Sequence, residues 1–322
     1  MSALRSPISR RSALGRLAAM SGALLTWNLA AESPAQTAPE QDAIAQMRKA
    51  MAGITPVTSK LTDQIHMISG PGGNIGVLTW SDGKLAVDSG IAGASDAILG
   101  QMAALGSQPL RLLINTHWHF DHTDGNESFR KNGALVIAHE NVRKRMGTPQ
   151  EIDFFRAHIP PSPGTALPQV TFPDQTSLSL DNEEVRVFHV EPAHTDTDSI
   201  IHFVNSNVIH GGDLVFSGFF PFIDYSTGGK INGMIQAADR IIGLSDANTR
   251  IIPGHGPVMG VEYMKRYRDM MTDVRDAVLR LKNQGKDLNG AIAAKPADKY
   301  AEVWGKGLLP PDQFTRVVYS SL

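Results

Sequence analysis

The sequence predicts one α/β domain in which mixed β-sheets are covered by outer helices. Short apolar runs that are typical of strands alternate with segments in which apolar residues recur at helical spacing. Their order is strands, helix, strand, helix, and then strands again with helices, without an internal repeat. The chain has 322 residues, of which 42% are hydrophobic and 19% are charged. This composition is typical of a globular protein, and a layered domain of about 280 residues fits the length.

The first half of the domain begins with a surface helix. Residues 39–53 carry apolar side chains at helical spacing, and Gly53 and Pro56 end the segment. Three short strands follow, joined by turn-forming residues, at 65–69, 74–80 and 84–88. The next expected elements are a helix, a buried strand, a helix, a strand and a helix, at 94–105, 110–115, 126–131, 134–138 and 140–146.

A glycine cluster at residues 70–76 needs its own interpretation. Glycine-rich loops can bind dinucleotides, but such loops follow a strand and open a helix. This cluster lies between two predicted strands instead. It therefore predicts a hairpin turn and no nucleotide site.

The second half opens with a long proline-rich segment at residues 147–169. A loop of this length inside a compact domain is usually functional or acts as a lid. Strands are then expected at 176–180, 185–190, 200–204, 207–211 and 250–253. Helices are expected at 231–244, 262–283, 288–294 and 312–320, so that a helical extension begins at about residue 260.

Charge and cysteine content exclude several classes of protein. The net charge is −2, and removal of residues 1–38, with four arginines and one glutamate, leaves 26 basic and 31 acidic residues. This acidic balance argues against a nucleic-acid partner. The chain has no cysteine, so it has no disulfide, no thiolate ligand and no cysteine nucleophile. Nothing in the sequence specifies an oligomeric state.

The N-terminus has the pattern of an export signal. The paired Arg10 and Arg11 precede a weakly apolar run at 17–29, followed by alanine, serine and proline. We predict a signal peptide over residues 1–38 that resembles the twin-arginine type, although Ala13 stands where such signals often have phenylalanine. The apolar run is too short to cross a membrane. A periplasmic or cell-envelope protein is expected, with the mature domain at 39–322 and no membrane span.

The strongest motif is H-x-H-x-D-H at residues 117–122, directly after the buried strand at 110–115. It places three imidazoles and one carboxylate where a strand ends and a loop begins, which is a common position for functional side chains. Imidazole and carboxylate together suit Zn²⁺ and its first-row neighbours.

Three further metal-type residues follow, each at the end of a predicted strand. They are His194, Asp213 in a G-G-D motif, and His255 in a P-G-H-G motif. The adjacent glycines allow close backbone approach and tight turns. The candidate set is therefore His117, His119, Asp121, His122, His194, Asp213 and His255.

In these four motifs and their order, the chain resembles the metallo-β-lactamase fold superfamily over roughly residues 60–260. The resemblance implies an αββα sandwich, a four-layer α/β (α+β) fold with the metal site at one edge. It also implies two zinc ions per chain. His117, His119 and His194 would bind one ion, Asp121, His122 and His255 would bind the other, and Asp213 would bridge them.

The resemblance implies a hydrolase in which a metal-bridging hydroxide attacks a carbonyl carbon. Asp121 would be the catalytic residue that orients this hydroxide. Asp213 occupies a position that is cysteine in some zinc β-lactamases, and Phe216 replaces their carboxylate-binding lysine. The expected substrate is a small molecule with an amide or ester bond, such as a β-lactam, a lactone or a related ester. Alternatives are a thioester hydrolase similar to glyoxalase II and an envelope accessory protein with weak turnover; a phosphodiesterase is disfavoured by the acidic balance.

Other polar residues near these motifs are interpreted as structural. Turn or capping roles are expected for Asp181, Asp196, Asp198 and Asp224. Thr195 or Asp196 is a candidate to hold the second nitrogen of His194. The remaining histidines are expected to be surface or hydrogen-bonded core residues, and among them His158 is the candidate for substrate contact. A run of aromatic residues at 216–225 is expected to pack in the core or to line a substrate pocket.

Overall fold

The computed structural model describes residues 43–322. The predicted signal peptide at residues 1–38 lies outside the described residues. The helix expected at 39–53 appears as α2 (Ala43–Ala52). Within the described part of the chain, no helix is both long and apolar enough to cross a membrane.

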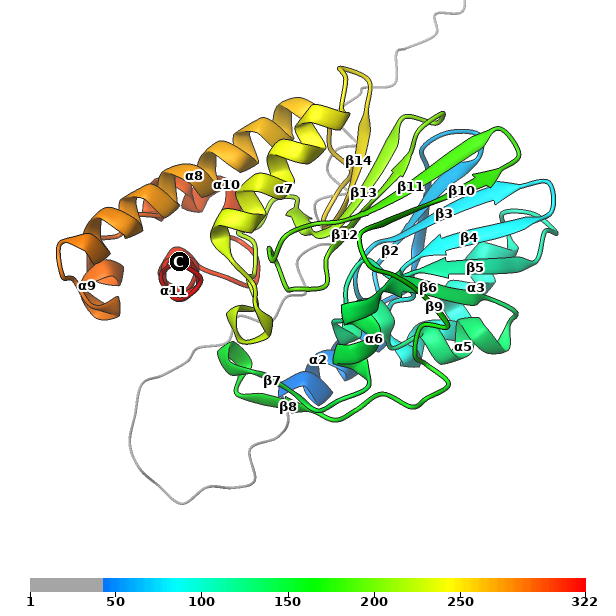
Figure 1. Ribbon diagram of the computed structural model, residues 1–322, viewed down its shortest axis with the longest axis horizontal. Helices are drawn as coiled ribbons and strands as arrows, with labels where there is room; N and C mark the ends of the chain where they lie inside the picture. Colours follow the sequence, from blue (N-terminus) through cyan, green and yellow to red (C-terminus); the bar gives the residue numbers. More distant parts are fainter. Residues whose placement is uncertain (1–42) are drawn as a thin grey trace, which may run out of the picture. The chain divides into compact units, whose positions relative to one another are not determined.

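Two β-sheets lie at the centre of this part of the chain, with helices on their outer faces (Figure 1). The first sheet has the order β1-β2-β3-β4-β5-β6-β9 and the second has the order β10-β11-β12-β13-β14. The strands of the first sheet are β1 (Val57–Lys60), β2 (Ile65–Ser69), β3 (Ile75–Trp80), β4 (Gly83–Val87), β5 (Leu110–Ile114), β6 (Leu135–His139) and β9 (Val170–Phe172). The strands of the second sheet are β10 (Gln175–Leu180), β11 (Glu183–His189), β12 (Ser199–Phe203), β13 (Val208–Phe216) and β14 (Arg250–His255).

The pattern of buried side chains shows why four layers form. Neighbouring strand residues point to opposite faces, so each sheet has two apolar faces to cover. In β4, Leu85 and Val87 pack between the two sheets. Ala86 points outward to the helices α3 (Ser95–Ala103) and α5 (Asn126–Lys131). The outer face of the second sheet packs on α7 (Ile231–Leu244) and α8 (Val261–Asn283). The predicted αββα sandwich is confirmed.

The C-terminal helices pack against the second-sheet side of the domain. They are α9 (Leu288–Ala293), α10 (Ala301–Trp304) and α11 (Pro311–Ser320). The loop after β13 is held against them, because the backbone N–H of Phe220 donates to the carbonyl oxygen of Trp304 at 2.8 Å. The Phe220 ring also stacks on Phe314, with 4.5 Å between ring centroids. These contacts fix one end of the loop that runs from β13 to α7.

Several short elements differ from the prediction. The segment 147–169, expected to be a loop, contains the antiparallel hairpin of β7 (Gln150–Ile152) and β8 (Ala157–Ile159). Strands of three residues are too short for periodicity to reveal them, and the same reason explains why β9 was missed. The short strand β1 and the C-terminal helix α10 were also missed. The hairpin turn predicted at the glycine cluster is confirmed between β2 and β3.

Two strands are longer than predicted, which changes the positions of two candidate ligands. Asp213 lies inside β13 and His255 is the last residue of β14, whereas both were expected beyond a strand. The pairing of these parallel strands shifts in register around Gly212, whose φ is +50°. Glycine permits this conformation without steric cost, so β13 continues through an irregular segment.

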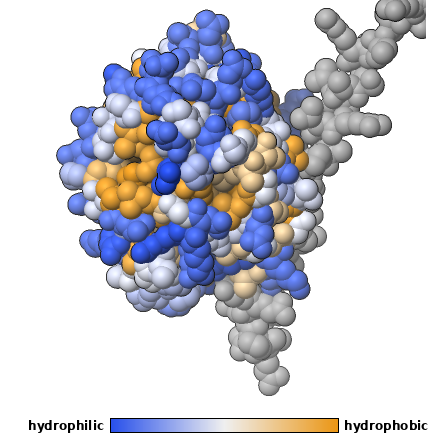
Figure 2. Space-filling view, turned by 90° about the vertical axis from the view of Figure 1, so that its right-hand side faces the viewer, coloured by the Kyte–Doolittle hydropathy of each residue, from blue (hydrophilic) through white to orange (hydrophobic). Residues whose placement is uncertain are grey.

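The surface also carries apolar residues. Figure 2 views the molecule from the right-hand side of Figure 1 and shows apolar side chains gathered among hydrophilic ones. On the neighbouring strands β6 and β9, Leu135 and Val170 are exposed by 38% and 44%.

Candidate metal centre

The H-x-H-x-D-H run changes direction in its middle. His119 has extended backbone angles and precedes the one-turn helix α4 (Phe120–Thr123). The prediction placed the whole run in a loop, and this helical turn was missed. Asp121 and His122 lie on this helical turn, whereas His117 and His119 precede it, so the six-residue run presents its ligands from two different backbone conformations.

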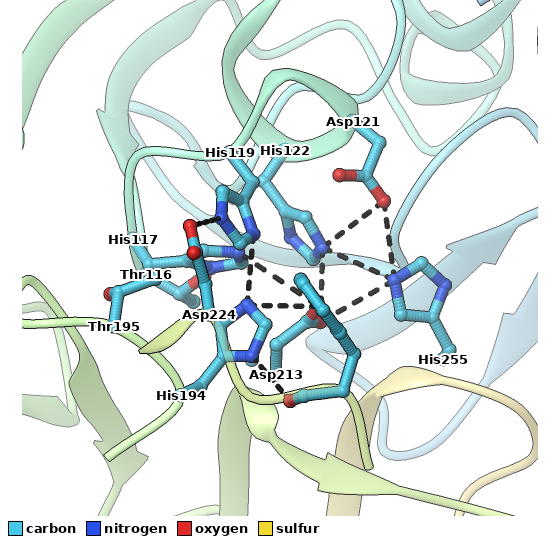
Figure 3. Close-up of polar contacts among 12 residues, drawn as sticks. Thr116, His117, His119, Asp121, His122, His194, Thr195, Asp213, Asp224 and His255 are labelled. Atoms are coloured by element: carbon cyan, nitrogen blue, oxygen red, sulfur yellow. Dashed lines mark hydrogen bonds and ion pairs between the residues drawn. The ribbon is translucent and has the colours of Figure 1, made fainter. Parts of the chain in front are cut away.

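The structure brings all seven predicted residues together in two groups. The possible ligand atoms of the first group lie within 4.8 Å of one another, and this group contains His117, His119, His194 and Asp213. The same limit holds for the second group, which contains Asp121, His122 and His255. Figure 3 shows that these side chains converge on a common centre.

Asp213 connects the two groups through its two carboxylate oxygens. Oδ2 lies 3.5 Å from Nε2 of His194 and 3.9 Å from Nε2 of His117. Oδ1 lies 3.1 Å from Nε2 of His122 and 3.4 Å from Nε2 of His255. Each oxygen therefore faces a different group, as a bridging carboxylate requires.

Two imidazoles of the first group are oriented by one loop. The Nδ1 atom of His194 lies 2.8 Å from the carbonyl oxygen of Phe222, and Nε2 of His119 lies 3.0 Å from Oδ2 of Asp224. Both acceptors fix a proton on the nitrogen that they contact. The other nitrogens, Nε2 of His194 and Nδ1 of His119, then face each other at 2.9 Å with lone pairs.

Asp88 orients His122 directly and His117 through Thr116. Its Oδ2 accepts from Nδ1 of His122 and from the Thr116 hydroxyl, both at 2.7 Å, and its Oδ1 accepts from the Thr116 backbone N–H. The Thr116 hydroxyl oxygen lies 3.0 Å from Nδ1 of His117. Asp88 has a φ of +67°, which is uncommon outside glycine and indicates that its position is set by these contacts.

These contacts correct the predicted partner of His194. Neither Thr195 nor Asp196 contacts its Nδ1 atom, which is paired with the Phe222 carbonyl. Thr195 instead donates to Asp198 from its N–H and its hydroxyl, and Asp196 forms an ion pair with Arg145 at 2.6 Å. A carbonyl partner leaves no trace in the sequence, because every residue has one.

Asp88 and Asp224 are functional residues that the sequence interpretation missed. Asp224 was expected only to cap a turn; it does accept from Thr227, and it also holds His119. Asp88 was treated only as the end of a predicted strand. A carboxylate directly after a buried strand is a signal that could have identified it.

Two glycines allow the backbone to approach the ligands closely. A Cβ atom on Gly73 would lie 2.1 Å from Cε1 of His122, and one on Gly254 would lie 1.9 Å from Oδ1 of Asp213. The glycine turn between β2 and β3 therefore packs on the His122 ring. The sequence predicted this turn but not its contact with the site.

The electrostatics of the second group favour ion pairs. Burial lowers the pKa of His255, but the Asp213 and Asp121 carboxylates outweigh burial and raise it to about 9. The pKa of His122 is raised well above its usual value by the same balance of burial against carboxylates. Burial likewise opposes ionisation of Asp121, yet the His122 and His255 imidazoles lower its pKa to about 2.

In the first group, burial outweighs the carboxylates and lowers the pKa values of two histidines. Burial lowers the pKa of His194 to about 4 and lowers that of His117 well below its usual value. Both imidazoles are therefore neutral at pH 7 and present lone pairs.

The donor set fits zinc. Within the described chain, Nε2 of His117 is buried without a hydrogen-bond partner, and unpaired buried polar atoms are costly. The lone pairs of His119 and His194 that face each other add to this cost. A cation bound between these atoms would satisfy all of them, and imidazole and carboxylate ligands suit Zn²⁺.

Aromatic residues surround the centre. Phe216 stacks on His255, whose side chain is 25% exposed, and Phe222 lies against His119 and His194. Trp118 and Phe120, which alternate with the ligands, are buried and border a cavity of about 150 Å³.

The other predicted candidates lie outside the two groups. His158 is exposed in the hairpin β7–β8 and pairs with Glu151 at 2.6 Å. His139 and His189 stack on each other, with 3.5 Å between ring centroids. None of the other described histidines belongs to either group, namely His66, His139, His158, His189, His202 and His210.

Comparison with protein families decides the classification. The family described as the Metallo-beta-lactamase superfamily matches residues 69–255, which is more than half of the chain. The chain belongs to the metallo-beta-lactamase superfamily. The match contains all seven candidate ligands and ends on His255.

Relatives within this superfamily include hydrolases. The chain is 24% identical over 223 residues to "Acyl-coenzyme A thioesterase MBLAC2" of Bos taurus, covering 62% of this chain and 78% of that protein. It is 29% identical over 109 residues to "Hydroxyacylglutathione hydrolase" of Pelagibacter ubique, covering 34% of this chain and 37% of that protein. The chain is therefore a metallo-beta-lactamase-like hydrolase, as the sequence predicts.

Solved structures show the same fold. A metallo-beta-lactamase from Pontibacter korlensis has a TM-score of 0.56 at 15% identity, covering 68% of this chain and 99% of that chain. The sec-alkylsulfatase Pisa1 from Pseudomonas sp. has a TM-score of 0.62 at 15% identity, covering 85% of this chain and 51% of that chain. At this level of identity the likeness concerns the fold alone.

Proposed function

We propose that the protein is a dinuclear zinc hydrolase that cleaves an ester-type carbonyl bond, with thioesters as the first substrate class. The observation that carries this proposal is the position of Asp213, whose two oxygens face two separate groups of imidazole and carboxylate ligands. A small molecule is the expected substrate.

His117, His119 and His194 would hold one zinc ion, Asp121, His122 and His255 would hold the other, and Asp213 would contact both. A bound pair of zinc ions supplies Lewis acidity and lowers the pKa of coordinated water toward neutrality.

The protein side chains would set the protonation states that this chemistry needs. Asp121 stays ionised at neutral pH, because its pKa is about 2. Its Oδ2 lies 3.2 Å from Nε2 of His255 and faces the centre. We assign Asp121 the role of accepting a hydrogen bond from the attacking water and so orienting it, in addition to its role as a ligand.

Two observations favour a thioester over a β-lactam. The matched relatives are named as an acyl-coenzyme A thioesterase and a hydroxyacylglutathione hydrolase. At the position where a lysine would bind the carboxylate of a β-lactam, this chain has Phe216, which stacks on His255. An apolar ring at this position cannot form an ion pair with an anionic substrate.

The test uses the full chain, loaded with zinc and assayed for metal content. Substrates would be acetyl-coenzyme A, octanoyl-coenzyme A, an acyl-homoserine lactone, nitrocefin and bis-p-nitrophenyl phosphate. We expect two zinc ions per chain and turnover of a thioester. D213N should lose both the second zinc ion and the turnover. D246N changes an aspartate in an exposed turn and should retain both.

Two outcomes would contradict the proposal. A protein that holds two zinc ions but hydrolyses no acyl substrate would favour an accessory metal-binding role. Turnover of the phosphodiester alone would place the enzyme in a different substrate class.

We also propose an exported, periplasmic or cell-envelope location, on the basis of the arginine pair and the apolar run within residues 1–38.

A further inference from the structure

The tip of the hairpin β7–β8 carries two adjacent phenylalanines. They belong to the single turn η2 (Asp153–Phe155), and their rings meet edge to face with centroids 5.1 Å apart. Both are only partly buried. Asp153 precedes the pair and the exposed Arg156 follows it, so the apolar tip lies between two charged residues.

Both rings lie against Phe222. The ring centroids of Phe155 and Phe222 are 5.1 Å apart, and those of Phe154 and Phe222 are 5.4 Å apart. Aromatic pairs at these separations are in favourable contact. The hairpin tip and the loop after β13 therefore form one aromatic cluster, although the two are about 70 residues apart in the sequence.

Phe222 in turn lies against two candidate zinc ligands. Its ring centroid lies 6.2 Å from that of His119, with the two planes inclined by 29°, and 5.8 Å from that of His194, which it approaches edge-on. A row of aromatic contacts thus leads from the ligands of the first group, through the buried Phe222, to the partly exposed Phe154 and Phe155. We call the three phenylalanines the aromatic wall.

The hairpin tip is fixed to the loop that orients these ligands. The backbone N–H of Asp153 donates to the Ser226 hydroxyl oxygen at 3.1 Å, and the Ser226 hydroxyl donates to Asp224. Asp224 also holds His119. One chain of hydrogen bonds therefore ties the aromatic wall to the metal centre and keeps it in a defined position beside the site.

We propose that the aromatic wall binds the hydrocarbon chain of an acyl substrate, so that the enzyme prefers medium-length apolar acyl groups to acetyl. This inference rests on the proposed hydrolase function. A carbonyl that reacts at the centre would direct its acyl chain past the buried Phe222 toward the partly exposed rings of Phe154 and Phe155. An acetyl group ends before it reaches Phe154 and Phe155, whereas an octanoyl chain extends to both rings and is removed from water.

Phe154 and Phe155 would be specificity-determining residues, and neither touches a candidate ligand through the contacts described above. Their loss should therefore affect long acyl chains selectively. A purely structural role would instead lower turnover of all substrates together.

The kinetic test compares the zinc-loaded full chain with F154A, F155A and the double variant, using acetyl-, butyryl-, hexanoyl- and octanoyl-coenzyme A. For the double variant we expect kcat/KM for octanoyl-coenzyme A to fall by about tenfold or more, with less than about a twofold change for acetyl-coenzyme A. F188A is the matched control, because Phe188 is also partly buried and contacts Arg240 instead of Phe222. It should leave the chain-length preference unchanged.

A binding measurement separates this inference from the proposed function. Calorimetry with octanoate and acetate, on the zinc-loaded chain at equal concentrations, does not depend on turnover. Tighter binding of octanoate that is lost in the double variant supports the aromatic wall. Equal binding of the two acids would overturn the inference even if thioesters are hydrolysed. A uniform loss of turnover across all chain lengths would overturn it as well.

Discussion

Asp224 decides which nitrogen of His119 faces the metal centre. Its Oδ2 lies 3.0 Å from Nε2 of that imidazole, so His119 presents Nδ1 toward His194. His194 instead presents Nε2, because its Nδ1 is paired with the Phe222 carbonyl. The same loop thus selects opposite nitrogens on two neighbouring ligands, which allows both lone pairs to meet one cation.

Replacing Asp224 should weaken zinc binding at the first group. In D224A the His119 ring loses the acceptor that fixes its proton and its orientation, and we expect about a 10- to 100-fold lower zinc affinity. The measurement is competition with a fluorescent zinc chelator. D246A removes an aspartate that closes a similar turn with Thr249 and should leave the affinity unchanged. Unaltered affinity in D224A would show that the turn alone holds His119.

Zinc binding at the second group should release protons. His122 and His255 have raised pKa values in the metal-free protein, and for His255 the value is about 9. Both imidazoles are protonated at pH 7 and must lose a proton to bind zinc. We expect release of about two protons at pH 7, measured by calorimetry in buffers of different ionisation enthalpy.

The pH dependence gives this experiment an internal control. Proton release should diminish as the pH rises above about 9, where His255 is already neutral. His117 and His194 have lowered pKa values and contribute no protons at pH 7. Binding heats that do not depend on the buffer at pH 7 would contradict the protonated state of the second group.

A methyl group at Gly73 should disturb the second group. The Cβ atom of G73A would lie 2.1 Å from Cε1 of His122, so either the imidazole or the turn between β2 and β3 must move. We expect a loss of about 1–3 kcal/mol in the free energy of unfolding, together with weaker binding of the second zinc ion. Urea unfolding and zinc titration measure the two effects.

The matched control for this substitution is G243A. Gly243 lies in α7, and an added Cβ atom there has no neighbour within 4 Å among the described residues. Alanine is the better helix former, so this variant should gain up to about 1 kcal/mol. If both glycine variants behaved alike, close packing on His122 would not be the reason for glycine at position 73.

His210 should make stability depend on pH. Its Nε2 donates to the Asn74 carbonyl at 3.0 Å and its Nδ1 accepts from the Gly212 N–H at 3.1 Å, so the folded protein needs the neutral ring. Burial lowers its pKa to about 4. Between pH 6.5 and 4 the unfolded chain binds a proton that the folded chain does not, so this contribution to stability falls as the pH falls.

This contribution of His210 should lower the free energy of unfolding by up to about 3 kcal/mol between pH 6.5 and pH 4. It can be measured by urea unfolding of the zinc-free protein, in which metal release does not contribute. H210Q retains a donor and an acceptor but does not titrate, so its stability should decline less steeply over this range. Parallel pH profiles for the two proteins would exclude His210 as a source of the acid sensitivity.

The site could be predicted from the sequence as far as side-chain chemistry and order specify it. H-x-H-x-D-H after a buried strand, G-G-D and P-G-H-G each combine a ligand type with a local backbone feature. The seven residues that these motifs and His194 supply are the ones that the fold brings together. Long helices such as α7 were also predictable, because their periodicity extends over several turns.

Features that depend on tertiary contacts could not be predicted in this way. The Phe222 carbonyl is selected as the partner of His194 by the path of a loop, and no side chain identifies it. The extension of β13 past Asp213 depends on its pairing with β14. The strands of the hairpin β7–β8 are too short to show an alternating hydrophobic pattern. The packing of the hairpin tip on Phe222 depends on a loop that is distant in the sequence.

The contacts of Phe220 with Trp304 and Phe314 have a consequence for the order of events during synthesis. This loop carries Phe222 and Asp224, which orient His194 and His119, and its packing partners come more than 80 residues later in the chain. A ribosome that has completed both sheets has therefore not yet supplied the support of the loop. The chain must be synthesised as far as Phe314 before this loop has all its packing partners. The candidate metal centre therefore reaches its final geometry only after the strands of both sheets have been made.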